Sequence, residues 1–135
     1  MTAASDGLFA FLYSSVLSPA YPASCVAAIV RNARETNAQQ GFTGLLVFDG
    51  QRFCQYLEGP RHALQQLLER IQADPRHGDF TLHHQGPLAG PRAFQDWSIA
   101  YAEIEDAMPL EEIAALAGAQ AQARLDALLP MLDYG

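Results

Sequence analysis

A short turn between two apolar segments constrains the fold of this chain more than any other feature of its sequence. The segments FTGLLVF (42–48) and QRFCQYLE (51–58) flank Asp49-Gly50. Asp-Gly readily adopts the backbone conformations of a tight hairpin turn, and both segments are rich in residues that favour strands. The sequence therefore predicts an antiparallel hairpin whose two strands lie side by side.

Further elements are predicted on both sides of the hairpin. Apolar residues recur at helical spacing after Ser24, which is expected to cap a helix that Gly41 ends. A second helix is expected over about 61–73, where Leu and Ile share one face. Apolar and aromatic runs predict strands at 8–15, 80–88 and 97–104. The resulting order, βαββαββ, is that of an α+β, ferredoxin-like sheet with two helices on one face.

The C-terminal segment can cover the other face of that sheet. PLEEIAALAG (109–118) places two acidic residues in its first turn, which favours a helix. AQARLDALLPML (121–132) places four leucines on one stripe. We expect a C-terminal helical pair packed on the same domain.

Composition restricts the class of protein. The chain has 135 residues, 50% of them hydrophobic and 17% charged, which suits one packed domain. Its formal net charge of −7 argues against binding to a nucleic-acid backbone, which needs clustered Lys and Arg. No apolar run reaches the length of a membrane span. With no signal-peptide pattern and only Cys25 and Cys54, which are expected to be reduced thiols, the predicted location is cytoplasmic.

Familiar catalytic and metal-binding motifs are missing from the sequence. It contains no GxGxxG, Walker A, HExxH or GxSxG pattern. His83 and His84 are neighbours in a predicted strand, so they point to opposite faces and do not form one ligand set. We expect no metal site.

Three polar residues occupy expected core positions. Tyr13 and Gln55 lie on adjacent central strands of the predicted sheet, and Asn37 lies near the end of the first helix. Each has an ordinary alternative, namely a backbone partner, a loop contact or a helix cap. Together they describe a cleft between two helices, floored by the sheet, that suits a flat, amide-rich heterocycle. For the polar group Asp74, Arg76 and His77 after the second helix, a solvated turn and a binding role are equally open.

Five segments occur in an order and at intervals that resemble the BLUF family, blue-light sensors that use flavin adenine dinucleotide (FAD). They are FLYSS, TNAQQGFTGLLVF, FCQYLEGP, ERIQADPRHGDF and FQDWSIAY, and they extend over about residues 8–102. The resemblance implies a flavin-binding domain over 1–102 and a helical extension over 103–135, as in short, single-domain relatives. FAD is the expected cofactor, with FMN or riboflavin as alternatives.

The resemblance also implies roles for individual residues. Tyr13 matches the photoactive tyrosine, Gln55 the switching glutamine, and Trp97 the tryptophan of the last strand. In the family, light drives an electron and a proton from the tyrosine, the glutamine hydrogen bonds rearrange, and absorption shifts slightly to the red. A neutral phenol is a usable one-electron donor at pH 7, in agreement with that role.

Further residues are expected to bind the flavin. Asn37 matches the asparagine at the edge of the ring, and Arg76 resembles the arginine near its pyrimidine carbonyl. Arg70, Asp74 and His77 are additional expected pocket residues.

Three positions depart from the family pattern. Thr36 replaces an asparagine found in many relatives, which weakens one expected polar contact. Ile99 replaces a methionine and loses its flexible thioether. Ala33 replaces a small hydroxyl residue.

The expected function is blue-light sensing that signals to a separate protein, without enzymatic activity, by a chain that forms homo-oligomers. The tail either completes the core or is the element that a partner recognises. Two alternatives remain open, a flavin-dependent redox enzyme and a ferredoxin-like interaction module without a cofactor. Glu58, Gly59 and Pro60 are expected to form a strand end and turn with no chemical role.

Overall fold

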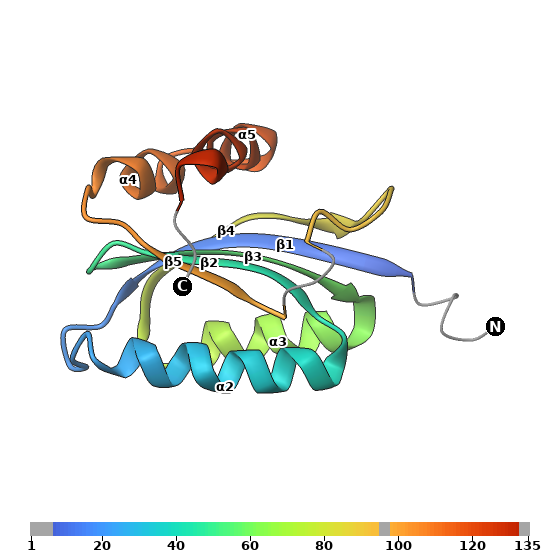
Figure 1. Ribbon diagram of the computed structural model, residues 1–135, viewed down its shortest axis with the longest axis horizontal. Coiled ribbons are helices and arrows are strands. Elements are labelled where there is room, and N and C mark those ends of the chain that lie inside the picture. Colours follow the sequence, from blue (N-terminus) through green and yellow to red (C-terminus); the bar gives the residue numbers. More distant parts are fainter. Residues whose placement is uncertain (1–6, 95–97, 133–135) are drawn as a thin grey trace.

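A five-stranded mixed sheet carries helices on both faces (Figure 1). The computed structural model describes residues 7–94 and 98–132. The elements along the chain are β1 (Leu8–Leu17), α2 (Cys25–Gln40), β2 (Thr43–Phe48), β3 (Arg52–Pro60), α3 (Arg61–Ala73), β4 (His77–Pro87), β5 (Ala100–Glu103), α4 (Met108–Ala114), α5 (Gly118–Leu128) and the 3-10 turn η1 (Leu129–Met131).

The predicted hairpin lies inside the sheet, whose strand order is β4-β1-β3-β2-β5. The Asp49 carboxylate accepts hydrogen bonds from the backbone N–H groups of Gln51 and Arg52 at 2.9 and 2.7 Å. Gly50 has a φ of 97°, which a side chain would strain. The Asp-Gly prediction and the ferredoxin-like α+β class are both confirmed.

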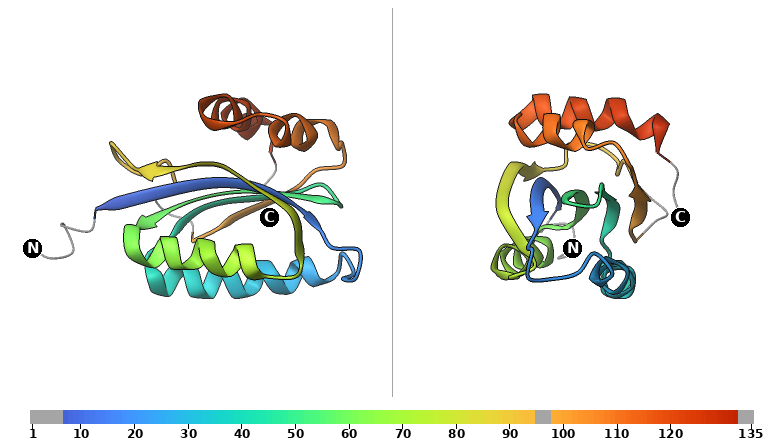
Figure 2. Two further views of the ribbon diagram at one scale, coloured as in Figure 1. Left: turned by 180° about the vertical axis from the view of Figure 1, so that it is seen from behind. Right: turned by 90° about the vertical axis from the view of Figure 1, so that its left-hand side faces the viewer.

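The hydrophobic core is divided by the sheet. Figure 2 shows α2 and α3 against one face and α4 and α5 against the other. On the face of α2 and α3 the buried apolar residues form two separate clusters, one under α3 around Phe11 and Leu64 and one under α2 around Val30 and Leu46. On the opposite face a single cluster joins the sheet to α4 and α5. The division on the first face leaves room for a cavity between the two helices.

The start of α2 differs from the sequence prediction. Ser24 precedes the helix, but its side chain makes no capping hydrogen bond and its backbone is already helical, with φ −62° and ψ −19°. The carbonyls of Pro22 and Ala23 accept the N–H groups of Cys25 and Val26 instead. The prediction that the Ser24 side chain caps the helix is therefore wrong, because backbone carbonyls of the preceding turn accept the first N–H groups instead. Gly41 ends the helix in the left-handed conformation, as predicted.

The C-terminal pair covers the second face, as expected, but its second helix is interrupted. α5 ends at Leu128 and the chain continues as a 3-10 turn that contains Pro130. Proline has no N–H to continue an α-helix. Leu125 and Leu128 are buried, and Leu129 and Leu132 pack against the same cluster.

None of the helices in residues 7–94 and 98–132 combines the length and apolar character needed to cross a membrane. The same residues contain no group of three or more His, Cys, Asp or Glu side chains placed to hold a metal ion.

Candidate binding site

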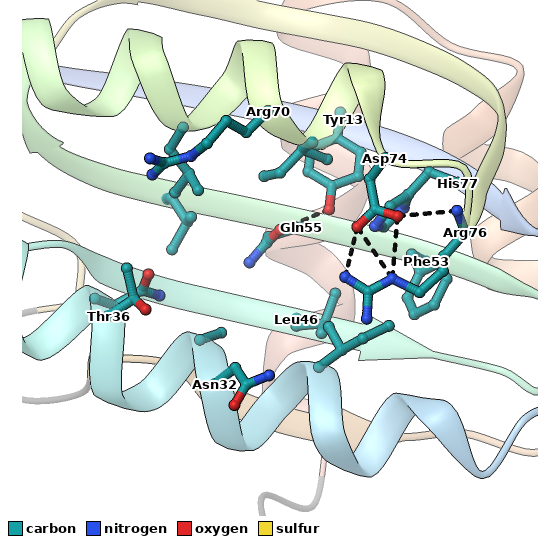
Figure 3. Close-up of a pocket in the computed structure, with 16 residues that line it drawn as sticks. Tyr13, Asn32, Thr36, Leu46, Phe53, Gln55, Arg70, Asp74, Arg76 and His77 are labelled. Atoms are coloured by element: carbon teal, nitrogen blue, oxygen red, sulfur yellow. Dashed lines mark hydrogen bonds and ion pairs between the residues drawn. The ribbon is translucent and has the colours of Figure 1, made fainter.

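A cavity of about 340 Å³ lies between α2 and α3, over the central strands of the sheet (Figure 3). Its volume falls in the range of small-molecule pockets. Apolar side chains from both helices and the sheet form its walls, and amide, hydroxyl and charged groups interrupt them. The lining residues are Tyr13, Ile29, Asn32, Ala33, Thr36, Asn37, Leu46, Phe53, Gln55, Leu57, Leu67, Arg70, Ile71, Asp74, Arg76 and His77.

Tyr13 and Gln55 are directly opposite in the pairing of β1 with β3 and share a short hydrogen bond. The Tyr13 hydroxyl donates to Gln55 Oε1 at 2.6 Å, and both residues are buried. Burial, with smaller contributions from Cys54 and Asp74, raises the pKa of the Tyr13 phenol, so it is neutral and acts as the donor.

The orientation of the Gln55 amide follows from that bond. Because Oε1 accepts from Tyr13, Nε2 lies on the side away from the phenol, as Figure 3 shows. Within the described residues Nε2 has no hydrogen-bond partner. A buried amide donor is therefore left for a ligand with an acceptor atom.

The ring of Tyr13 is held from several sides. Phe80 stacks on it with centroids 4.7 Å apart, and His77 meets it edge-on at 5.9 Å. His77 Nδ1 also lies 2.7 Å from the Ser15 hydroxyl, and burial lowers the pKa of this histidine. Packing on this scale fixes the direction of the hydroxyl toward Gln55.

Helix α2 supplies amide and hydroxyl groups to the opposite wall. Asn37 is buried, and its Nδ2 donates to the backbone carbonyl of Ser98 at 2.9 Å. It therefore lines the cavity and also ties α2 to the residue that precedes Ile99 and β5. Asn32 and Thr36 lie on the same helix at the exposed rim (Figure 3). Asn32 was not identified from the sequence, although it lies one helical turn before Thr36.

Arg76 and Asp74 form a close ion pair at the end of α3. Arg76 Nε donates to both carboxylate oxygens at 3.0 and 3.1 Å, and Nη2 donates to Oδ2 at 2.6 Å. The Arg76 guanidinium lowers the pKa of the Asp74 carboxyl. Asp74 thus orients Arg76 beside the cavity. A partly solvated turn and a role in binding, the two alternatives for this polar group, are therefore compatible with each other. Arg70 also lines the cavity, from an exposed position.

The remaining expected residues differ in how they are placed. Trp97 lies outside the described residues. Ile99 is buried in the cluster under α2. Ala33 and Thr36 both line the cavity, so these departures from the family pattern lie at its wall.

Glu58 is a structural residue that the sequence did not reveal. It is fully buried on the face opposite the cavity, where its carboxylate accepts from the Tyr56 hydroxyl at 2.9 Å and from the N–H groups of Ala93 and Phe94 at 3.0 Å each. It therefore anchors Ala93 and Phe94, in the segment that follows β4. An acid that shares strand parity with apolar Tyr56 was the available signal, since a buried carboxylate needs partners.

Comparison with known proteins agrees with this geometry. The model of a family described as "BLUF: Sensors of blue-light using FAD" matches residues 8–100. Photoactivated adenylate cyclase subunit beta of Euglena gracilis is 41% identical over 80 residues, which make up 59% of this chain but 9% of that protein. The chain therefore spans less than a tenth of this relative.

Solved structures agree over most of the chain. The dark-state structure of the BLUF protein BlrB matches with a TM-score of 0.78 and 33% identity, covering 92% of this chain and 96% of BlrB. Klebsiella pneumoniae BlrP1 with FMN and cyclic diGMP matches with a TM-score of 0.70 and 29% identity, covering 91% of this chain and 36% of that protein.

Proposed function

The chain belongs to the BLUF family of blue-light sensors, and from this premise we propose that it senses blue light through a flavin bound between α2 and α3. The observation that carries the proposal is the Tyr13–Gln55 hydrogen bond, together with a Gln55 Nε2 at the cavity that has no partner in residues 7–94 and 98–132. The hydrogen bond joins a redox-active phenol, that of Tyr13, to the Gln55 side chain, an amide that can exchange its donor and acceptor ends.

The residues fit a flavin ring by their chemistry. Such a ring has apolar faces and hydrogen-bonding groups along its edge. Ile29 of α2 and Leu67 and Ile71 of α3 can pack on its faces. Gln55 Nε2 offers a donor, and we propose that Asn37 and Arg76 bind further edge atoms, with Arg70, Asp74 and His77 as supporting pocket residues.

We propose FAD as the cofactor, in agreement with the family description. FMN is the alternative, because BlrP1 has been solved with FMN. Releasing the flavin from purified protein by heat and separating it by chromatography distinguishes FAD, FMN and riboflavin.

The protein residues explain how light can act without a net reaction. Flavin, when bound, absorbs blue light and becomes a strong one-electron oxidant. With its electron taken up by the bound flavin, the Tyr13 phenol would become strongly acidic. Its proton would then pass along the existing hydrogen bond to Gln55 Oε1 while Gln55 Nε2 gives a proton to the ligand acceptor that it faces. Gln55 must then exchange donor and acceptor, by rotation or tautomerisation. Return of the electron and proton to Tyr13 leaves its composition unchanged, and Gln55 in a new hydrogen-bond arrangement.

The signal then requires a receiver. We propose a separate protein partner in the cytoplasm, with residues 1–102 as the sensing unit, residues 103–135 as its extension, and a homo-oligomer as the assembly. In Euglena the related sequence is part of a photoactivated adenylate cyclase, which supports transmission to an effector. We propose no enzymatic activity for this chain, because its cavity is accounted for by photochemistry. The free thiols Cys25 and Cys54 agree with a reducing compartment.

Absorption spectra before, during and after blue light test the function. A flavin spectrum with a small, reversible red shift is expected, since the rearranged amide changes the hydrogen bonding at the ring. Persistent bleaching with an added reductant would favour a redox enzyme. No visible absorption in protein supplied with flavin would contradict both functions.

A further inference from the structure

His83 lies at a β-bulge directly beside Tyr13. In the pairing of β1 with β4, Leu12 is opposite His84 and Tyr13 is opposite Leu82, so His83 is the additional residue of β4. Bulges bend a strand and redirect a side chain. His83 is buried, whereas His84 is exposed.

Both ring nitrogens of His83 are engaged. Nδ1 lies 2.8 Å from the carbonyl oxygen of Leu116, and Nε2 lies 2.5 Å from the Ser14 hydroxyl. A carbonyl can only accept, so Nδ1 carries the hydrogen. In the neutral ring Nε2 then accepts from Ser14. Burial lowers the pKa of His83, which favours this neutral form.

The two partners belong to different layers of the molecule. Ser14 follows Tyr13 in β1, and neighbouring strand residues point to opposite faces, so Tyr13 faces the cavity and Ser14 faces the tail. Leu116 lies in the turn between α4 and α5. A chain of adjacent groups therefore runs from the Tyr13 phenol through β1 and His83 to the C-terminal helices.

The other contacts between the sheet and the tail are less directional. The cluster shared by the sheet, α4 and α5 is apolar and does not prescribe one relative position. Among the described residues, the other hydrogen bond from the sheet to these helices joins Arg52 to Glu111 at 3.4 Å, and it is exposed. The His83 bonds are directional, and the bond to Ser14 is buried while the bond to Leu116 is part-buried, so they form a defined link between Ser14 and Leu116.

We infer that His83 couples the strand that carries Tyr13 to the C-terminal helices, so that a rearrangement at Tyr13 and Gln55 changes how α4 and α5 dock on the sheet. This inference rests on the proposed photosensing function. It assigns His83 the role of a coupling residue, because His83 is not among the residues that line the cavity.

Two conservative variants each remove the hydrogen bond between Ser14 and His83. Ser14→Ala removes the hydroxyl. His83→Asn keeps an amide nitrogen near the position of Nδ1 for Leu116 but removes the group that meets Ser14. Both are expected to keep the tail docked in the dark. His84→Asn, at the exposed neighbour, is the matched control.

Trypsin cleavage at Arg124 measures docking of the tail. Arg124 lies in α5 and is the only Lys or Arg after Arg92, so cleavage there releases one defined fragment. The full-length, flavin-loaded protein is digested in the dark and under continuous blue light. The light-to-dark ratio of the Arg124 cleavage rates is determined, and the red shift is recorded on the same samples.

We expect the wild type and His84→Asn to change their Arg124 cleavage rate several-fold in light. Ser14→Ala and His83→Asn should show a normal red shift and the wild-type dark rate, but a ratio near one. A wild-type ratio in both variants would overturn the inference, as would a ratio near one in wild type that shows the red shift. Absence of the red shift from the wild type would instead contradict the proposed function, and the coupling with it. If the dark cleavage rate at Arg124 rises in His83→Asn but not in Ser14→Ala, the substitution of His83 has loosened the tail. The light-to-dark ratio of Ser14→Ala alone then tests the inference.

Discussion

At the scale of single residues, the site depends on one hydrogen bond whose direction is fixed. Among the described residues the Tyr13 hydroxyl donates to Gln55 alone, and the Gln55 amide nitrogen has no partner. An amide can reverse its donor and acceptor ends at little steric cost, which a leucine of similar size cannot do. In the function that we propose, this reversibility is the role of a buried polar group whose desolvation would otherwise be a net cost.

Replacing Tyr13 by phenylalanine tests the electron and proton donor. Tyr13→Phe retains the stacking on Phe80 and should still bind flavin, but the reversible red shift should be lost because the phenol is gone. Difference absorption spectra in light and dark measure this. Tyr101→Phe, at a partly exposed tyrosine on β5, should keep the full shift. A full shift in Tyr13→Phe would refute the donor role.

Truncation of Gln55 tests the bridge. Gln55→Ala removes a hydrogen bond to the ligand, worth about 1 kcal/mol, so flavin affinity should fall roughly fivefold. The red shift should disappear, since no amide remains to rearrange. Fluorescence titration with FAD gives the affinity and illuminated spectra give the shift. Gln66→Ala, at an exposed glutamine of α3, is the control and should change neither. A reversible shift in Gln55→Ala would exclude the bridging role.

At the scale of elements, residues 92–94, which follow β4, are held by groups distant in sequence. Glu58 accepts the N–H groups of Ala93 and Phe94, and Arg92 donates to the Gly41 carbonyl at 2.7 Å and to the Thr43 hydroxyl at 3.1 Å. Gly59 adds a steric requirement, because a Cβ there would meet the Phe42 ring at 2.5 Å. Glu58 therefore anchors Ala93 and Phe94 at this end of the sheet, and Gly59 leaves the space that the Phe42 ring occupies.

Glu58→Gln should weaken the anchoring of Ala93 and Phe94. The amide retains one acceptor oxygen, so at least one of the two N–H groups loses its partner and stability should fall by about 1–3 kcal/mol. Urea unfolding followed by circular dichroism measures the loss. Glu111→Gln, at an exposed carboxylate of α4, should cost less than 1 kcal/mol. Equal stability of Glu58→Gln and wild type would show that this anchoring does not depend on the carboxylate.

Local patterns predicted the elements better than their ends. The hairpin at Asp49-Gly50 and the helix over 61–73 follow from turn chemistry and apolar periodicity, which are properties of neighbouring residues. The failed Ser24 cap depended on backbone carbonyls of the preceding turn, which composition does not specify. β4 begins at His77, whereas the sequence predicted a strand from residue 80. The additional residues are in the strand because His77 pairs with Leu17 across the sheet.

At the scale of the whole molecule, the two faces of the sheet have different tasks. The face of α2 and α3 holds the cavity, and the face of α4 and α5 packs on an apolar cluster and, in the coupling that we propose, receives the movement of the sheet. The helices on the two faces of the sheet and the proximity of Tyr13 to Gln55 were both predicted from the sequence, because both follow from the order of the strands. The sequence did not reveal Glu58 or His83, since their partners Ala93 and Leu116 come from segments that no local pattern places near them.

The buried histidines should make stability depend on pH. Burial lowers the folded-state pKa of His77 and His83, whereas in the unfolded chain a histidine titrates near pH 6.5. As pH falls below about 6.5, the unfolded chain binds protons that the folded protein resists. The stability from these groups is therefore fully present above pH 6.5 and is lost as pH falls through their folded pKa values.

Urea unfolding at pH 7.5, 6.5 and 5.5 separates this effect from that of Asp74. The free energy of unfolding of the wild type should fall toward pH 5.5, and His83→Asn should flatten the slope by up to about 1.4 kcal/mol per pH unit. The Asp74 carboxyl also has a lowered pKa, but its contribution is lost only as pH falls below its ordinary value of 3.8. Asp74→Asn should therefore not flatten the slope between pH 7.5 and 5.5, because its only effect there is to remove a charge that raises the pKa of His77. An identical slope in wild type and His83→Asn would mean that His83 binds its proton equally well in the folded and unfolded chain, contrary to its burial between β1 and the tail.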